Sequence, residues 1–187
     1  ISSDWRVKFM KEYGYDAETE FPTLTDWKNS TDDDIKYYSG TAIYSKTVKI
    51  DKKLLDCNKV ILDLGNVQMS AEIIINNKNA GILWMPPFKK DITGMLRPGK
   101  NLIEIKVTNQ WTNRLIGDER YPIQNGGYRI ERDTPKGKMP KWYTDNKPMP
   151  AGPRMTFCTG QFYKKDSPLI SAGLIGPAKI YFNIVSN

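Results

Sequence analysis

The alternation of apolar and polar residues between Asn101 and Asn109 limits the fold of this chain more than any other feature of its sequence. Apolar residues fill every second position and polar residues fill the positions between them: Ile103, Ile105 and Val107 against Glu104, Lys106 and Thr108. Successive side chains of a strand point to opposite faces of a sheet, so this spacing predicts a half-buried antiparallel strand.

Similar patterns recur along the chain. They predict strands at Trp5–Phe9, Thr41–Ile50, Val60–Leu64, Met69–Ile75 and Ala178–Ile184. A helix could be argued only for Asp4–Tyr13, which overlaps the first of these strands. One-sided apolar faces have to cover one another, so the pattern predicts an all-β fold, an antiparallel two-sheet β-sandwich.

Turn residues separate the expected strands. The run Asn76–Gly81 is rich in residues that tolerate positive φ and should close a tight hairpin, and Arg97–Lys100 should form a second turn. Asn101 can bond the backbone of its own loop, and Asp91 can cap a short turn before Ile92. These local roles make both residues determinants of the fold rather than ligands.

Residues 111–168 break the pattern, because Gly, Pro, Asn and charged residues dominate there and the alternation disappears. Such a stretch is far longer than a usual loop. Long ordered loops on a rigid scaffold often carry function, although an inert covering excursion is the alternative. We therefore expect a single domain, 1–187, made of an N-terminal strand and entry segment (1–38), core strands (39–110), a long irregular loop region (111–168) and a closing strand (169–187).

Several classes of protein are excluded by composition. The 187 residues include no histidine, which rules out the usual Ser-His-Asp and Cys-His catalysis and imidazole metal sites. Cys57 and Cys158 lie far apart, so neither a zinc site nor a disulfide framework is indicated, and both are expected to remain thiols. No apolar run is long enough to span a membrane, and no signal peptide opens the chain, so Ile1 is expected to be a processed or excised end.

The block Ile73–Asn109 carries a specific family resemblance. It reads IIINNKNAGILWMPPFKKDITGMLRPGKNLIEIKVTN, and it resembles the sugar-binding jelly-roll domain of glycoside hydrolase family two. That domain has a strand, an Asn/Gly turn, Pro-Phe, Asp-Ile-Thr, and Pro-Gly-x-Asn before the next strand. Further segments look like the C-terminal sandwich of bacterial α-L-rhamnosidase-like hydrolases: Ser39–Tyr44, Asn113–Glu119, and Asp166–Leu169 followed by Gly173–Pro177.

This resemblance implies a galactose-binding domain-like jelly roll, and a non-catalytic carbohydrate-binding accessory domain of a bacterial glycoside hydrolase that is secreted, periplasmic or on the cell surface. The catalytic carboxylates of the family sit on a separate barrel domain, so the expected partners are carbohydrate and that catalytic domain. No cofactor is expected, although jelly rolls of this family sometimes hold a structural calcium ion. The acidic run Asp32–Asp34 lacks the ligand spacing of a calcium loop and is more typical of a solvated turn.

Sugars are bound by aromatic rings that stack on the pyranose and by carboxylates, amides and Arg that bond its hydroxyls. The best cluster of these types directly follows the Asn101–Asn109 strand, at the expected rim of the sandwich: Trp111, Asn113, Arg114, Asp118 and Glu119. The alternative is that Trp111 packs under the long loop while Arg114 pairs with one of the two carboxylates.

Trp84 is a further candidate for carbohydrate binding. It precedes the apolar elbow Met85–Phe88, which could present the indole to solvent, although core packing is favoured because buried Trp is the commoner case. Trp142 and Tyr143 lie in a stretch rich in Lys and Pro, where they could form a binding platform or an interdomain contact.

The net charge of +7 allows an alternative, an independent basic β-sandwich that binds polysaccharide or nucleic acid. No basic helix or RNA-binding strand motif supports specific nucleic-acid binding. A small hydrolase that uses Asp118 and Glu119 as its acid pair fails because neighbours on an extended loop point apart. The sharpest hypothesis is that Asp118 is exposed, is oriented by Arg114, and leans into the active site of a neighbouring catalytic domain.

Overall fold

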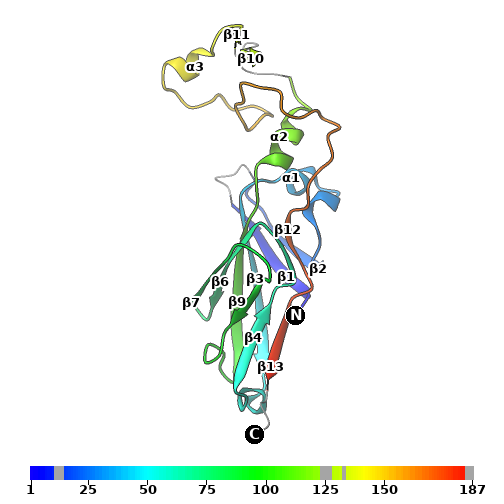
Figure 1. Ribbon diagram of the computed structural model, residues 1–187, viewed down its shortest axis with the longest axis vertical. Coiled ribbons are helices and arrows are strands. Elements are labelled where there is room, and N and C mark those ends of the chain that lie inside the picture. Colours follow the sequence, from blue (N-terminus) through cyan, green and yellow to red (C-terminus); the bar gives the residue numbers. More distant parts are fainter. Residues whose placement is uncertain (11–14, 123–127, 132–133, 184–187) are drawn as a thin grey trace. The chain divides into compact units, whose positions relative to one another are not determined.

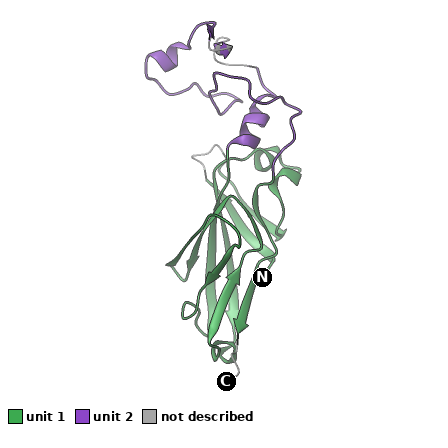
Figure 2. Cartoon of the chain, in the orientation of Figure 1, with its two compact units in different colours: residues 1–110, 171–187 green, residues 111–170 purple. Residues whose placement is uncertain are grey.

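The computed structural model describes residues 1–10, 15–122, 128–131 and 134–183. The chain divides into two compact units (Figure 2). Unit 1 comprises Ile1–Gln110 and Ser171–Asn187, and unit 2 comprises Trp111–Ile170. Unit 2 therefore contains almost the same residues as the long region in which the alternation of the sequence disappears.

Unit 1 is an antiparallel β-sandwich whose larger sheet has six strands in the order β2-β1-β3-β9-β6-β7 (Figure 1). These strands are β1 (Ser3–Phe9), β2 (Glu18–Thr23), β3 (Thr41–Ile50), β6 (Ser70–Ile75), β7 (Lys78–Leu83) and β9 (Gly99–Thr108). The longest pairing joins β3 to β9, with Thr41 opposite Thr108 at one end and Ile50 opposite Gly99 at the other. The all-β fold predicted from the alternation is confirmed.

Two smaller sheets complete unit 1. One has the order β13-β4-β8, and the other pairs β12 with β5. Their strands are β4 (Lys59–Asp63), β5 (Asn66–Gln68), β8 (Lys89–Asp91), β12 (Gly173–Gly176) and β13 (Lys179–Asn183). Short helical turns link the strands of this unit: η2 (Trp27–Asn29), α1 (Asp33–Lys36) and η3 (Lys52–Leu55).

The buried faces of the strands are those that the alternation predicts. Ile103, Ile105 and Val107 of β9 are fully buried, and so are the inward-facing residues of β1, β4 and β6. Met69 is an exception, because it precedes β6 and is half exposed, so its assignment to the buried face was wrong. Ile184 lies outside the described residues.

A buried aromatic contact ties the end of the chain to the large sheet. The Trp27 Nε1–H donates to the Tyr44 hydroxyl at 2.7 Å, and the backbone N–H of Leu174 donates to the same oxygen at 3.2 Å. Complete burial raises the pKa of Tyr44 above its ordinary value. Gly173 has a φ of +91°, and a Cβ there would lie 2.5 Å from the Trp27 indole nitrogen, so the close approach of β12 requires glycine.

The predicted turns are also found. Asn76 and Asn77, with φ of 50° and 64°, close the β6–β7 hairpin in two residues, and the chain is already in β7 at Lys78. The buried Asn101 side chain accepts from the Arg97 N–H at 2.9 Å and donates to the carbonyls of Arg97 and Gly99 at 2.7 and 3.0 Å. It therefore holds the turn that precedes β9, as expected.

The acidic run Asp32–Asp34 lies at the start of α1. Asp32 Oδ1 accepts from the Asp34 N–H at 2.9 Å, and Oδ2 accepts from the Tyr15 hydroxyl at 2.9 Å. Burial and the Asp32 hydrogen bond raise the pKa of Tyr15 to about 12. Both carboxylate oxygens of Asp32 are thus engaged, and no three acidic or thiol side chains of the described ranges gather as metal ligands. The run does not supply a calcium ligand set, and calcium binding by this chain stays a prediction.

The described residues of unit 2 form short elements: α2 (Thr112–Asp118), β10 (Arg129–Glu131), β11 (Thr134–Lys136) and α3 (Lys141–Thr144). The expectation that a helix could form only at Asp4–Tyr13 was wrong, because residues 4–9 of that segment belong to β1 and α2 forms in unit 2. Residues 11–13 lie outside the described residues. Within the described parts of the chain, no helix has the length and apolarity to cross a membrane. Cys57 and Cys158 form no disulfide bond.

Candidate carbohydrate-binding site

Five of the six candidate residues lie on or beside α2, the helix that directly follows β9 in the chain. Only Trp84 lies elsewhere, in unit 1. With seven residues and no side-chain cap at Trp111, α2 is too short to be stable by itself. Its stability has to come from side-chain contacts, and these contacts show which candidates remain accessible to a ligand.

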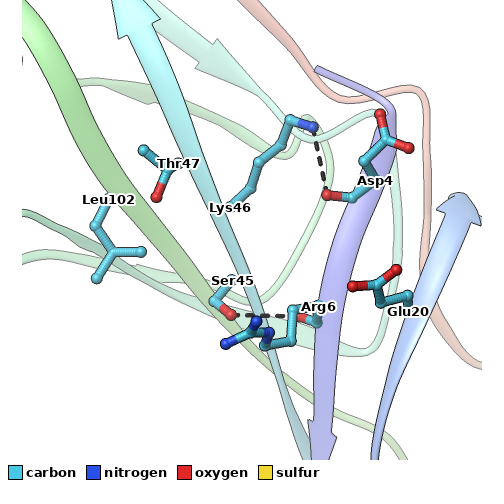
Figure 3. A pocket seen from close by; sticks show the side chains of 7 residues that line it. All are labelled: Asp4, Arg6, Glu20, Ser45, Lys46, Thr47 and Leu102. Carbon is cyan, nitrogen blue, oxygen red and sulfur yellow. Dashed lines mark hydrogen bonds between the residues drawn. The ribbon is translucent and has the colours of Figure 1, made fainter.

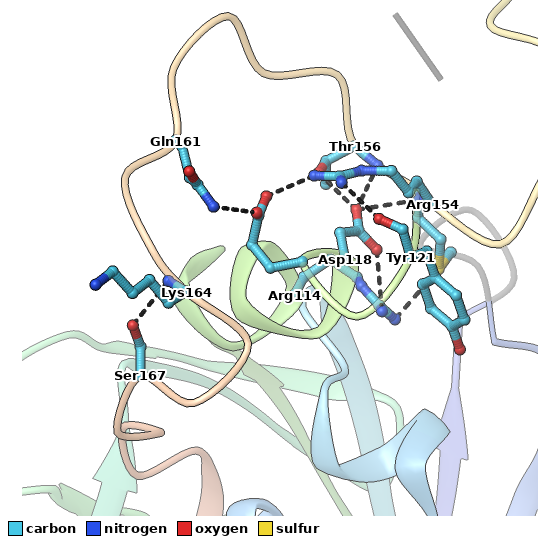
Figure 4. A network of polar contacts seen from close by, with 10 residues as sticks. Arg114, Asp118, Tyr121, Arg154, Thr156, Gln161, Lys164 and Ser167 are labelled. Atoms are coloured by element: carbon cyan, nitrogen blue, oxygen red, sulfur yellow. Dashed lines mark hydrogen bonds and ion pairs between the residues drawn. The ribbon is translucent and has the colours of Figure 1, made fainter. Parts of the chain in front are cut away.

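Asp118 and Arg114 form a buried ion pair one helical turn apart. Arg114 Nη2 lies 3.1 Å from Asp118 Oδ1, and the side chains are 8% and 0% exposed (Figure 4). The second oxygen of Asp118 accepts three hydrogen bonds, from the Met155 N–H at 3.1 Å, the Thr156 N–H at 2.8 Å and the Thr156 hydroxyl at 2.6 Å. The exposed carboxylate expected at Asp118 is therefore not found, and the alternative, pairing with Arg114, is what the structure shows.

Glu119 takes part in a second ion pair. Its Oε1 lies 2.6 Å from Arg154 Nη2, and its Oε2 accepts from the Gln161 amide at 3.0 Å. Arg154 also donates to the Tyr121 carbonyl at 3.0 Å. Both neighbouring carboxylates are thus occupied by protein donors. Asp118 and Glu119 lie at the end of a helix, so the expectation of an extended loop was wrong. Because both carboxylates are bonded to protein groups, they still cannot act as an acid pair.

Asn113 and Trp111 have opposite environments. The Asn113 amide is buried and bonds the backbone of Ile170 twice, donating to its carbonyl at 2.8 Å and accepting from its N–H at 3.0 Å. Trp111 begins the helix with 55% of its surface exposed. Of the cluster on α2, Trp111 alone combines a ring suited to stacking with broad access to solvent.

Trp84 follows β7, the edge strand of the large sheet, and is 70% exposed. Core packing, which the base rate favoured, was therefore wrong for this residue. Ile82 and Met85 beside it are also more than half exposed. These three apolar side chains lie at and just beyond the end of β7.

Comparison with known proteins identifies the chain. Residues 2–132 match the family described as "Glycosyl hydrolases family 2, sugar binding domain". The chain is a member of this family. This sugar-binding domain is also 42% identical over 182 residues to a "Putative beta-glucuronidase" of Formosa agariphila, covering 96% of the chain and 15% of that relative.

Solved structures agree with this assignment. A rhamnosidase from Novosphingobium sp. PP1Y matches 96% of the domain at 30% identity with a TM-score of 0.75, and the domain covers 14% of that protein. A β-D-glucuronidase of Dictyoglomus thermophilum matches 58% of the domain at 20% identity with a TM-score of 0.50, which shows likeness of fold alone. The chain thus spans about one seventh of the length of the relatives that it matches along nearly its whole sequence.

Several residues of the α2 network could not be found from the sequence of the sugar-binding domain. Arg154, Thr156 and Gln161 reach α2 from a stretch without regular structure, 35 to 42 residues further along the chain. No spacing motif links such positions.

The aromatic residues Trp142 and Tyr143 contact each other and Phe157, with ring centroids 5.1 to 5.9 Å apart, so they form a small aromatic cluster within unit 2.

Proposed function

We propose that this sugar-binding domain is a non-catalytic accessory module of a secreted, periplasmic or cell-surface glycoside hydrolase, in which it faces glycan through Trp111. The family assignment supports carbohydrate binding by this domain and its place in a glycoside hydrolase. An extracytoplasmic location follows from the expectation that polymeric glycans are met outside the cell. Neither carboxylate of the α2 cluster is available for acid–base chemistry, so hydrolysis is assigned to a separate catalytic domain.

On α2 the Trp111 ring is exposed, whereas the Asn, Arg and Asp side chains of the helix are buried, and this contrast supports the proposal. Arg114 and Asp118 fix the helix from inside, and Asn113 fixes its first turn to Ile170. The Trp111 ring is thereby placed on a helix that is held from several sides. A ring whose position is fixed loses little conformational freedom when a sugar stacks on it, so this arrangement favours binding.

We further propose that the α2 segment completes the active site of the neighbouring catalytic domain. The exposed Trp111, and not the buried Asp118, is the residue that would contact substrate there. Asp118 would act as a positioning residue, through the helix that it stabilises. Trp84 remains a second candidate for sugar contact, in unit 1.

Binding by the isolated domain tests the role of Trp111. Trp111→Ala should weaken binding of a neutral oligosaccharide such as cellohexaose by about 1 to 2 kcal/mol, or about 5- to 30-fold in Kd, because the stacking face is lost. Phe162→Ala is the matched control, since Phe162 is an exposed aromatic residue of unit 2 outside any helix or strand. Isothermal titration calorimetry that gives equal affinities for Trp111→Ala and the unchanged domain would remove Trp111 from the site.

Kinetics of the full-length hydrolase test the completion of the active site. Trp111→Ala should lower kcat/KM by a similar factor, whereas Phe162→Ala should leave it unchanged. If the Trp111 variant binds cellohexaose weakly but hydrolyses substrate normally, the domain is a binding module without a part in the active site.

A further inference from the structure

The outer face of the large sheet contains two adjoining hollows. One, the Arg6 hollow, has a volume of about 310 Å³, and the other, the Lys100 hollow, of about 380 Å³. Both include Thr47 and Leu102, which are opposite each other on β3 and β9. The two hollows thus adjoin at this pair of residues, and both lie within unit 1.

The Arg6 hollow presents charges of both signs. Its charged side chains come from β1, β2 and β3 (Figure 3): Asp4, Arg6, Glu20 and Lys46. Sugar hydroxyls both donate and accept hydrogen bonds, so carboxylates and cations placed side by side suit them. A ligand carboxylate, in contrast, would be repelled by Asp4 and Glu20.

The Lys100 hollow presents positive charge only. Arg97 and Lys100 are its charged lining residues, beside the exposed amide of Asn77. The Arg97 Nε–H donates to the Lys100 carbonyl at 3.3 Å, so the guanidinium group lies against the backbone of Lys100. Lys49 stands directly opposite Lys100 in the sheet, which adds a third cation at this end.

These three cations are not neutralised within the described residues, where none of them forms an ion pair. Other cations of the outer face have partners: Arg6 pairs with Glu18 at 3.1 Å and Lys106 with Glu72 at 3.2 Å. Like charges opposite each other in a sheet are destabilising. A bound anion would remove this repulsion and would gain charge-assisted hydrogen bonds from Arg97 and Lys100.

From this arrangement we propose a second carbohydrate-binding site for an acidic glycan, with a uronate carboxylate in the Lys100 hollow and the hydroxyls of the adjoining sugars in the Arg6 hollow. The site rests on the proposed carbohydrate-binding function, but it is independent of Trp111. A sugar carboxylate is favoured over a nucleic-acid phosphate because the mixed charges of the Arg6 hollow would repel a continuous row of phosphates.

The test compares two hexasaccharides that differ by a single carboxylate: cellohexaose, and glucuronosyl-cellopentaose, in which one terminal glucose is replaced by glucuronate. The domain should bind glucuronosyl-cellopentaose at least tenfold more tightly than cellohexaose at low salt, and added salt should reduce this preference. Arg97→Gln/Lys100→Gln should abolish the preference. Lys8→Gln/Lys165→Gln removes the same charge from exposed positions outside both hollows and should retain it.

The outcomes separate this site from the one at Trp111. Equal affinity of the unchanged domain for both ligands, or unchanged binding of glucuronosyl-cellopentaose by Arg97→Gln/Lys100→Gln, would overturn the acidic-glycan site. Trp111→Ala should weaken cellohexaose and leave the tighter binding of glucuronosyl-cellopentaose unchanged, and its failure to weaken cellohexaose would count against the proposed function instead. A hexathymidylate that binds as tightly as glucuronosyl-cellopentaose would show a general polyanion surface and also overturn the proposal.

Discussion

Replacing Asp118 with Ala should unfold the packing around α2 while unit 1 stays folded. The change removes the acceptor of three hydrogen bonds, all from Met155 and Thr156, and leaves the Arg114 guanidinium buried without its counter-charge. Breaking a buried ion pair by removing one partner costs about 3 to 5 kcal/mol. Because both side chains are almost completely buried, little of this cost is screened by water. It is a large part of the total stability of a typical domain, about 5 to 15 kcal/mol.

Amide hydrogen exchange followed by mass spectrometry measures this effect locally. Peptides that contain Met155 and Thr156 should exchange much faster in Asp118→Ala, whereas peptides from β3 and β9 should be unchanged. Asp145→Ala is the control, since Asp145 pairs with Lys147 at 3.6 Å on the exposed surface of the same unit. Such exposed pairs contribute about 0 to 1 kcal/mol, so exchange in this variant should match that of the unchanged protein.

A double-mutant cycle then isolates the pair itself. Adding Arg114→Ala to Asp118→Ala should cost little more than Asp118→Ala alone, because the unpaired charge is removed with it. Strictly additive losses of stability, or normal protection of Met155 and Thr156 in Asp118→Ala, would refute the view that Asp118 holds the helix in place.

Three further predictions concern unit 1. Ile105→Asp places a carboxylate in the core without a partner and should abolish folding or lower the Tm sharply, which thermal unfolding followed by circular dichroism would show. Asn101→Ala leaves buried backbone groups of the preceding turn unpaired and should lower the free energy of unfolding in urea by roughly 1 to 3 kcal/mol. Above pH 10 the unfolded state loses the tyrosine proton before folded Tyr44 does, so stability is kept below pH 10 and falls above it, by up to about 1.4 kcal/mol per pH unit. In Tyr44→Phe this decline should be shallower, although the variant starts from lower stability.

The sandwich could be predicted because its determinants are local. The burial of Ile103, Ile105 and Val107 follows from their spacing alone, since a strand has only two faces. Asn76 and Asn77 indicate a two-residue turn because few other residues adopt two successive positive φ angles. Each of these signals is contained within ten residues of sequence.

The accessibility of the tryptophans could not be predicted in the same way. Trp84 lies beside the apolar elbow Met85–Phe88, which in sequence resembles a buried segment. Its exposure depends on which parts of the fold pack against the segment after β7, and no single segment encodes that packing. The residues next to a tryptophan in the sequence therefore do not show whether its ring is exposed. Only the tertiary structure shows whether a ligand can reach it.

The role of Asp118 depends on contacts that are still more distant in sequence. The residue types on α2 are equally consistent with a sugar site and with a structural network, because both use Arg, Asp and Asn as hydrogen-bonding groups. What decides between them is the return of Met155 and Thr156 to the same helix, where their backbone N–H groups donate to one oxygen of Asp118. One oxygen of Asp118 accepts three hydrogen bonds, and the other lies 3.1 Å from the Arg114 guanidinium group without accepting a hydrogen bond. The side chain is 0% exposed, so a ligand cannot reach it. The sequence correctly locates sugar-binding residue types at α2, but the tertiary contacts show that Arg114 and Asp118 stabilise the helix. Trp111 is then the residue of this cluster that is accessible to a sugar.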